Sequence, residues 1–334
     1  MKRAGNLMEK ICSIDNLYLA FYKASKGKRF DSAVVDFRNN LHPNIALLQK
    51  QLSNGKISIG NYHYFTIFDP KIRQICAAEF TERIVHHAIM NVCHDFFERQ
   101  LIYDTYATRP KKGTYAALER AKSAMKKNQY VVKLDFKKYF DSISHDVLTI
   151  KLQKIFKDRQ LLNLFKQIID SYHVETGRGI PIGNLTSQYF ANYYLSEFDH
   201  YAKETLKIDT YIRYMDDILI FGNEKDTLHL HVSNLNEKAK TELLLSFKPP
   251  VFALCKKGIS FLGYKLFPNK TLLNRMSKKR FLKSMRSSSN LLKQNHFDEK
   301  KIQMKLFGFL TFAKYAYSKR IRRKVSTFYA EEEN

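Results

Sequence analysis

The 334-residue sequence lacks the apolar runs of roughly 18 residues that membrane-spanning helices need, which argues against a membrane protein. Charged residues near the N-terminus break up the apolar region of a signal peptide, so we expect the protein to stay in the cytoplasm. The four cysteines, at positions 12, 76, 93 and 255, form no Cys-x-x-Cys pair, so the common zinc-binding spacings are absent. The sequence also has no internal repeat and no low-complexity linker.

Acidic residues are scarce relative to basic ones. The chain has 57 Lys and Arg against 32 Asp and Glu, which gives a net charge of +25. Such a balance favours polyanionic partners, because each phosphate contact releases counterions and adds affinity that does not depend on sequence. The 25 Phe and 20 Tyr provide surfaces on which unpaired bases can stack, besides core. The composition therefore indicates a protein that binds nucleic acid.

Two adjacent carboxylates, Asp216 and Asp217, are the most informative feature of the chain. Apolar and β-branched residues flank them within residues 211–221, which predicts two short strands joined by an acidic turn. Adjacent carboxylates repel each other, and burying an unpaired charge is unfavourable, so a divalent cation would stabilise the pair. Mg²⁺ suits this role because it combines one or two carboxylates with substrate phosphates. The alternative interpretation is a solvated Asp-Asp turn.

A third carboxylate, Asp135, ends the apolar segment 130–134, which we expect to be a strand. Phosphoryl transfer between two metal ions would need a carboxylate from such a second segment. The alternative role for Asp135 is to cap a helix that follows the strand. Asp141 and Asp146 are further acids close in sequence.

The Tyr-Met-Asp-Asp sequence at residues 214–217 resembles the catalytic hairpin of reverse transcriptases, and residues 130–143 resemble their first catalytic motif. The resemblance implies an RNA-directed DNA polymerase that uses two Mg²⁺ ions, with Mn²⁺ as the alternative metal. It assigns catalysis and metal binding to Asp135, Asp216 and Asp217.

The same resemblance assigns nucleotide contacts to two further places. Lys71 and Arg73 lie two residues apart in an extended run, so their side chains would share a face and could hold a triphosphate. A solvated edge strand protected by its charges is the alternative. The ring of Phe140 would pack against the sugar of the incoming nucleotide and exclude a 2′-hydroxyl, whereas core packing is its alternative role.

A Gly-rich segment over residues 177–195 precedes a predicted helix and resembles the family's motif B. Many relatives have Gln and Pro at the two positions where this sequence has Ile182 and Gln188. The version with Ile and Gln resembles that of the reverse transcriptases of diversity-generating retroelements, which copy RNA with errors at adenines. We expect Ile182, Gly183 and Gln188 to contact the nucleotide. Ile182 cannot form a hydrogen bond with a base, so discrimination between nucleotides would fall. Gly183 would let the backbone approach a template base or nucleotide closely.

Primer and template contacts are implied for three basic or aromatic segments and for the acidic turn. The segment around Arg109 resembles a fingers motif, with a basic surface loop as its alternative, and residues 261–264 resemble the primer grip. Lys248 loosely matches the lysine that assists departure of pyrophosphate. The residues assigned to primer and template are Arg109, Lys111, Lys112, Tyr214, Met215, Phe261, Leu262, Gly263, Tyr264, Arg320, Arg322, Arg323 and Lys324.

The resemblance implies an α/β (α+β) fold, a right-hand polymerase. Fingers and palm, an antiparallel sheet with helices, would interleave over residues 1–269, and a short basic helical thumb would follow over residues 270–334. Residues 271–330 contain 16 Lys and Arg against two acids, which suits a helical unit that grips a duplex backbone.

The favoured role is that of a diversity-generating retroelement enzyme, prokaryotic or phage-encoded, that makes cDNA from a dedicated template RNA. Its partners would be the template RNA, the RNA–DNA duplex, dNTPs, and a small basic accessory protein or a second reverse transcriptase subunit. The alternative is an antiphage defence enzyme that copies a non-coding RNA within a multi-subunit complex. An inactive RNA-binding scaffold is less favoured, because it would not need three carboxylates.

Overall fold

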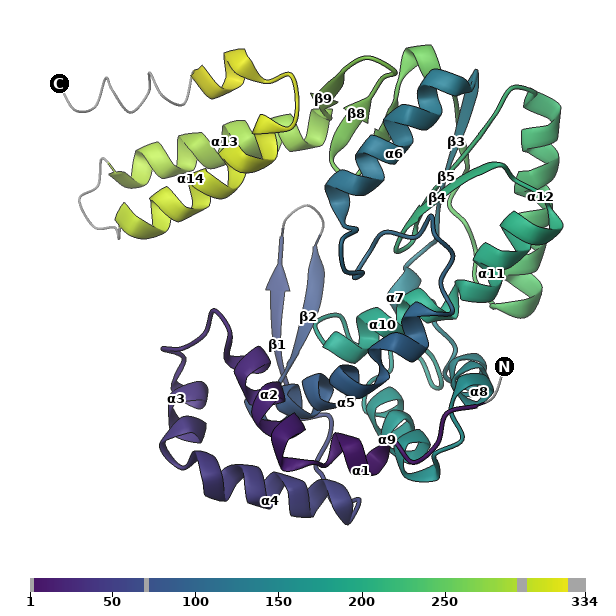
Figure 1. Ribbon diagram of the computed structural model, residues 1–334. Helices are drawn as coiled ribbons and strands as arrows, with labels where there is room; N and C mark the ends of the chain where they lie inside the picture. Colours follow the sequence, from purple (N-terminus) through teal and green to yellow (C-terminus); the bar gives the residue numbers. More distant parts are fainter. Residues whose placement is uncertain (1–2, 69–71, 293–298, 324–334) are drawn as a thin grey trace.

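A computed structural model describes residues 3–68, 72–292 and 299–323 of the chain (Figure 1). Within these ranges, no helix is both long and apolar enough to cross a membrane. Helices make up the first part of the chain: α1 Met8–Ile11, α2 Ile14–Ser25, α3 Ser32–Asn39 and α4 Leu41–Ser53. An antiparallel hairpin follows, formed by β1 Tyr62–Ile67 and β2 Arg73–Ala78, and leads into α5 Phe80–Glu98 and α6 Thr114–Lys127.

The central sheet has four antiparallel strands in the order β4-β5-β3-β6. Its strands are β3 Tyr130–Asp135, β4 Thr210–Tyr214, β5 Asp217–Gly222 and β6 Val251–Leu254. The helices between and after them are α7 Tyr139–Ser142, α8 His145–Ile155, α9 Arg159–Asp170, α10 Leu185–Tyr194, α11 Ser196–His200 and α12 Lys225–Glu242. The register of β3 and β5 places Asp135 directly opposite Asp217.

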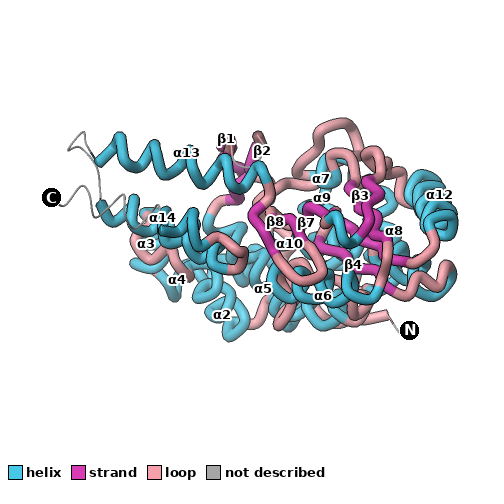
Figure 2. Tube along the Cα trace, turned by 90° about the horizontal axis from the view of Figure 1, so that it is seen from above, coloured by secondary structure: helices cyan, strands magenta, loops and turns pink. Residues whose placement is uncertain are grey.

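A smaller antiparallel sheet and a pair of helices complete the described chain. The strands are β7 Ile259–Phe261, β8 Tyr264–Leu266 and β9 Thr271–Leu273, and the helices are α13 Arg275–Leu292 and α14 Glu299–Lys314. Two views agree that α13 and α14 lie side by side and extend to the side opposite α12 (Figures 1 and 2). The predicted fold class, mixed α/β with antiparallel sheets, is confirmed.

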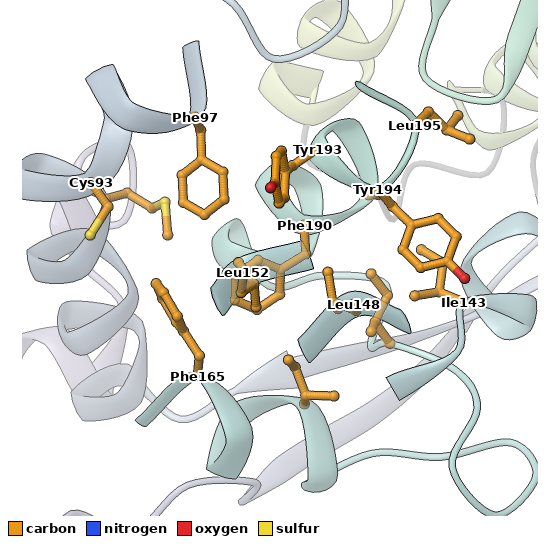
Figure 3. Close-up of a cluster of buried hydrophobic side chains, with 14 of the residues drawn as sticks. Cys93, Phe97, Ile143, Leu148, Leu152, Phe165, Phe190, Tyr193, Tyr194 and Leu195 are labelled. Carbon is orange, nitrogen blue, oxygen red and sulfur yellow. The ribbon is translucent and has the colours of Figure 1, made fainter. Parts of the chain in front are cut away.

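Both faces of the central sheet are buried, because alternate strand residues are apolar on each side. Val132 and Leu134 face the larger core, whereas Val131 packs with α6 in a second core. The larger core includes aromatic and aliphatic side chains of α5, α8, α9 and α10 (Figure 3). Since side chains alternate, Asp135 and Asp217 project on the α6 side, where the second apolar layer ends.

Candidate active site

The turn between β4 and β5 contains two residues, Met215 and Asp216. Met215 has a φ of 55°, a conformation that non-glycine residues rarely adopt. Such backbone strain persists only where the surroundings impose it, and it is concentrated at functional sites. The predicted acidic turn between two strands is therefore present, and its backbone is held in an unusual conformation.

Each of the three carboxylates has a different electrostatic environment. Burial, together with the negative charges of Asp217 and Asp135, raises the pKa of Asp216 above its ordinary value. Burial also raises the pKa of Asp217, although the Nζ of Lys133 lies 2.7 Å from its Oδ1 and opposes the shift. Lys248 forms an ion pair with Asp135. Two of the three carboxylates are thus paired with lysines, whereas Asp216 has no ion pair within the described part of the chain.

The oxygen donors suit a hard cation such as Mg²⁺, although they do not form a ready-made cage. No three His, Cys, Asp or Glu side chains of the described ranges lie close enough together to hold a metal ion. Burial and the neighbouring carboxylates nevertheless both disfavour the charged form of Asp216 and raise its pKa, so a bound cation would stabilise that charge. This arrangement fits Mg²⁺ bound by one or two carboxylates and completed by substrate phosphates.

We predict that Asp216→Asn stabilises the metal-free protein at neutral pH. Because the pKa of Asp216 is raised in the folded state, its contribution to stability is lost as the pH rises through that pKa. The amide removes this unfavourable charge, so thermal unfolding in EDTA should show a higher Tm, and added Mg²⁺ should raise the Tm less than in the wild type. The exposed Asp146→Asn is the control. A variant that melts below the wild type in EDTA would contradict the prediction.

The turn opens into a cleft of about 1040 Å³. Its walls come from the β1–β2 hairpin, the segment after β3, the loop before α10, the β7–β8 turn and the helices α13 and α14. Eleven of the predicted site residues line it: Arg73, Phe140, Ile182, Gly183, Gln188, Tyr214, Met215, Asp216, Asp217, Leu262 and Gly263. Lys248 also lines the cleft and forms an ion pair with Asp135, which is itself absent from the lining. Lys71 falls outside the described residues.

Gly183 allows a close approach between two parts of the protein itself. A Cβ at this position would lie 2.4 Å from the carbonyl oxygen of Cys76 in β2, and the φ of Gly183 is +139°. The amide of Cys76 donates a hydrogen bond of 2.8 Å to the carbonyl of Ile182. The close approach that the absence of a side chain permits is therefore with the backbone of the hairpin, whereas contact of Gly183 with a nucleotide stays a prediction, since the residue lines the cleft.

Arg109 is a structural residue, so its predicted contact with template is wrong. Its side chain is 8% exposed, and Nη2 lies 2.7 Å from Glu98. Its Nη1 donates to the carbonyls of Ile102 and Thr105. Lys112 donates to the carbonyl of Tyr103 and covers the ring of that residue.

Two of the four predicted primer-grip residues are also buried. Phe261 and Tyr264 are 1% and 0% exposed and belong to the second core, so their predicted contact with primer is wrong. Only Leu262 and Gly263, which form the turn between β7 and β8, face the cleft. The alternation of strand side chains explains this division, because the residues flanking the turn point into the core.

The predicted basic cluster after α14 does not reach the cleft. Arg320, Arg322 and Arg323 are absent from its lining, and Lys324 falls outside the described residues. Six residues of the helices α13 and α14, none of them predicted as site residues, line the cleft instead: Ser277, Arg280, Phe281, Gly308, Phe309 and Phe312. The signal in the sequence for Phe281, Phe309 and Phe312 is an apolar helix face, a pattern that by itself predicts packing.

Comparison with known proteins identifies relatives for the part of the chain that contains the acidic turn. A family profile described as "Reverse transcriptase (RNA-dependent DNA polymerase)" matches residues 68–266, more than half of the chain. Protein YkfC of Escherichia coli is 24% identical over 145 residues, covering 40% of this chain and 38% of that protein. The putative COX1/OXI3 intron 2 protein of Saccharomyces cerevisiae is 24% identical over 248 residues, covering 55% of this chain and 29% of that protein. The chain thus spans well under half the length of these curated relatives.

Among solved structures, telomerase from Candida tropicalis in complex with a TWJ fragment of telomeric RNA is similar to this chain, with 12% identity and a TM-score of 0.49. The similarity covers 87% of this chain and 59% of that one.

Proposed function

Because this chain belongs to the reverse transcriptase family, we propose that it synthesises DNA on an RNA template within the cleft described above. The fold is that of a right-hand polymerase. We take the fingers and palm to interleave up to β9, since β9 pairs with β8, and the thumb to begin at α13. The boundary predicted at residue 270 would divide this strand pair.

One observation carries the proposal: residues from three other segments line the same cleft as the acidic turn. Arg73, Phe140 and the Ile182–Gly183 loop line the same cleft as Asp216 and Asp217. A cation, an aromatic ring and clustered carboxylates match the triphosphate, sugar and reacting centre of a nucleotide. These residues are far apart in the sequence, and the fold brings them to one cleft.

The carboxylates Asp135 and Asp216 would hold Mg²⁺, and Asp217 would lie beside them, fixed by Lys133. When bound there, the metal would activate the primer 3′-hydroxyl and neutralise charge on the leaving pyrophosphate. Arg73 would bind the triphosphate, and Lys248 would add positive charge next to the leaving group. Leu262 and Gly263 would contact the primer.

Within the family, we propose the role of a diversity-generating retroelement enzyme. The supporting feature is Ile182, which lines the cleft and offers the nucleotide no side-chain hydrogen bond. Sequencing of RNA and cDNA that co-purify with the protein would test this role. Adenine-specific errors and a variable repeat matching the template would support it, whereas faithful cDNA from a non-coding RNA would favour antiphage defence.

We predict that Phe140→Ala relaxes selection against ribonucleotides. The ring lies half-buried in the cleft wall, so its loss should open space for a 2′-hydroxyl and raise the ribonucleotide-to-deoxynucleotide incorporation ratio roughly tenfold. Single-nucleotide extension measures the ratio. Phe21→Ala, which removes a ring packed on Phe37 away from the cleft, should leave it unchanged. Equal ratios in both variants would return Phe140 to a packing role.

A further inference from the structure

A fully buried arginine lies directly behind the acidic turn. Arg213, in β4, has a side chain with 0% exposure and pairs with Asp199 of α11, which is equally buried. It is two residues before Met215, and strand alternation points it away from the second core, toward α10 and α11. A buried ion pair of this kind is weak evidence of stabilisation, since well-packed apolar residues often stabilise a core as well. The buried Arg213–Asp199 ion pair therefore needs an explanation other than stability.

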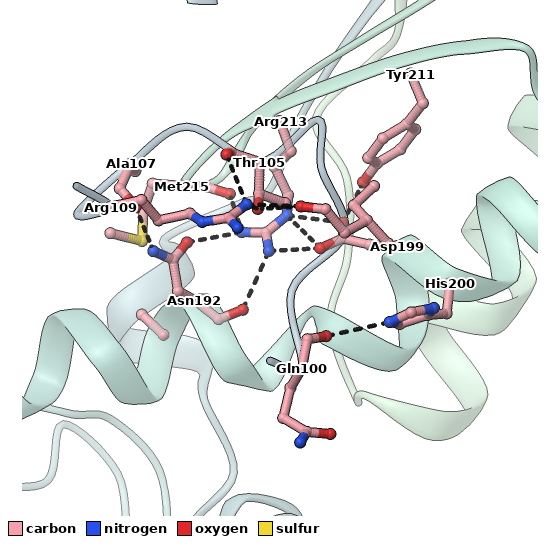
Figure 4. A network of polar contacts seen from close by, with 12 residues as sticks. Gln100, Thr105, Ala107, Arg109, Asn192, Asp199, His200, Tyr211, Arg213 and Met215 are labelled. Carbon is pink, nitrogen blue, oxygen red and sulfur yellow. Dashed lines mark hydrogen bonds and ion pairs between the residues drawn. The ribbon is translucent and has the colours of Figure 1, made fainter. Parts of the chain in front are cut away.

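The guanidinium of Arg213 is held in one orientation by its partners (Figure 4). Its Nε lies 2.7 Å from Asp199 Oδ1, and its Nη2 lies 2.6 Å from Oδ2, which forms a two-pronged ion pair. The side-chain oxygen of Asn192, in α10, accepts from Nη1 at 3.1 Å, and the carbonyl of Asn192 accepts from Nη2 at 3.1 Å.

Another hydrogen bond of this guanidinium reaches the acidic turn. Nη1 donates to the carbonyl oxygen of Met215 at 3.0 Å. That carbonyl belongs to the peptide that joins Met215, with its φ of 55°, to Asp216. Fixing the orientation of this peptide plane restricts the direction in which the backbone enters Asp216.

A second layer fixes the partners of Arg213 in turn. The hydroxyl of Tyr211 donates to Asp199 at 2.6 Å, and the side-chain amide of Asn192 donates to the carbonyl of Ala107 at 2.6 Å. Asn192 is also one helical turn after Gln188, which lines the cleft. The network therefore connects the turn to the helix that carries the opposite wall.

We propose that Arg213 is a positioning residue, which holds the Met215 carbonyl so that Asp216 presents its carboxylate to the cleft at a fixed distance from the α10 wall. This inference rests on the proposed function. Asp199, Asn192 and Tyr211 serve it by fixing the guanidinium. Arg213 itself is fully buried and lies outside the cleft lining, so it would act through the turn and not by contact with a substrate.

The test compares Arg213→Lys with the wild type in single-turnover primer extension on an RNA template. Lysine keeps the charge but cannot form the two-pronged ion pair with Asp199 and the hydrogen bond to the Met215 carbonyl at the same time. We expect the maximal extension rate to fall about 100-fold, as a displacement near 1 Å can cause, while template–primer Kd changes less than twofold. The half-saturating Mg²⁺ concentration should rise, a readout that a loss of folded protein would not move.

Arg109→Lys is the control, because Arg109 also forms a two-pronged ion pair with a carboxylate and donates to carbonyls, in a partly buried setting, but does not touch the turn. It should lose thermal stability with little loss of rate per folded molecule. Equal rate losses in the two variants at equal Tm, or a folded Arg213→Lys with a wild-type rate, would overturn the proposal. A wild-type protein that extends no primer would instead overturn the proposed function.

If Arg213→Lys fails to fold, Tyr211→Phe tests the same point with a smaller change. It removes only the hydroxyl that orients Asp199. A several-fold lower extension rate with unchanged template affinity supports the proposal, and a rate equal to that of the wild type overturns it.

Discussion

Replacing Asp216 by Asn should abolish primer extension while leaving RNA affinity within a few-fold of the wild type. The carboxylate lies in the turn, its pKa is raised, and it has no lysine partner within the described chain. Of the three carboxylates, Asp216 therefore depends most on a bound cation to compensate its charge. Loss of a metal ligand removes several kcal/mol of transition-state stabilisation, a reduction of about 1000-fold or more in rate. Binding depends mainly on the basic surface, which the substitution does not alter.

Single-turnover extension and fluorescence anisotropy on the same template–primer measure the two quantities separately. Asp146→Asn, which neutralises an exposed acid at the start of α8, should extend primer at the wild-type rate. Undiminished extension by purified Asp216→Asn would remove the assignment of this carboxylate to catalysis.

The second large effect is expected from Gly183→Ala. A methyl group 2.4 Å from the carbonyl oxygen of Cys76 cannot be accommodated, so either β2 or the loop carrying Ile182 must move. Both line the cleft where the triphosphate and base would lie. Overpacking and backbone strain together should lower the free energy of unfolding by about 2–5 kcal/mol. The nucleotide KM should rise by more than about tenfold, since 1.4 kcal/mol of lost binding is tenfold.

Gly177→Ala separates the two causes. Gly177 also has a positive φ, +72°, but a Cβ there meets nothing within 4 Å. It should therefore show the strain-related loss of Tm without the increase in nucleotide KM. If Gly183→Ala kept the wild-type KM, the contact between the hairpin and the loop would have no part in nucleotide binding.

The acidic turn and its partner strand could be predicted because their local patterns are strong. Apolar strands around Asp216 and Asp217, and the strand ending at Asp135, can be recognised within a few residues. The pairing register then brings Asp135 and Asp217 opposite each other, as the chemistry requires. The catalytic roles of these residues remain predictions.

Residues whose exposure depends on distant contacts could not be predicted in the same way. A basic loop predicts contact with nucleic acid, but Arg109 meets Glu98, eleven residues earlier, and becomes buried. The role of Arg213 is hidden in the sequence for a related reason, since its partner Asp199 becomes adjacent only when β4 packs on α11. Charge alone does not show whether a cation faces solvent or a carboxylate inside the protein.

The pairing of Lys133 with Asp217 and of Lys248 with Asp135 has a consequence for ionic strength. Both ion pairs are partly buried, so mobile ions screen them less than they screen charges on the open surface. The excess positive charge elsewhere on the chain is spread over a surface that dissolved salt screens efficiently. Salt should therefore release the nucleic acid long before it disturbs the carboxylates, so capture of template and bond formation respond to the ionic medium independently.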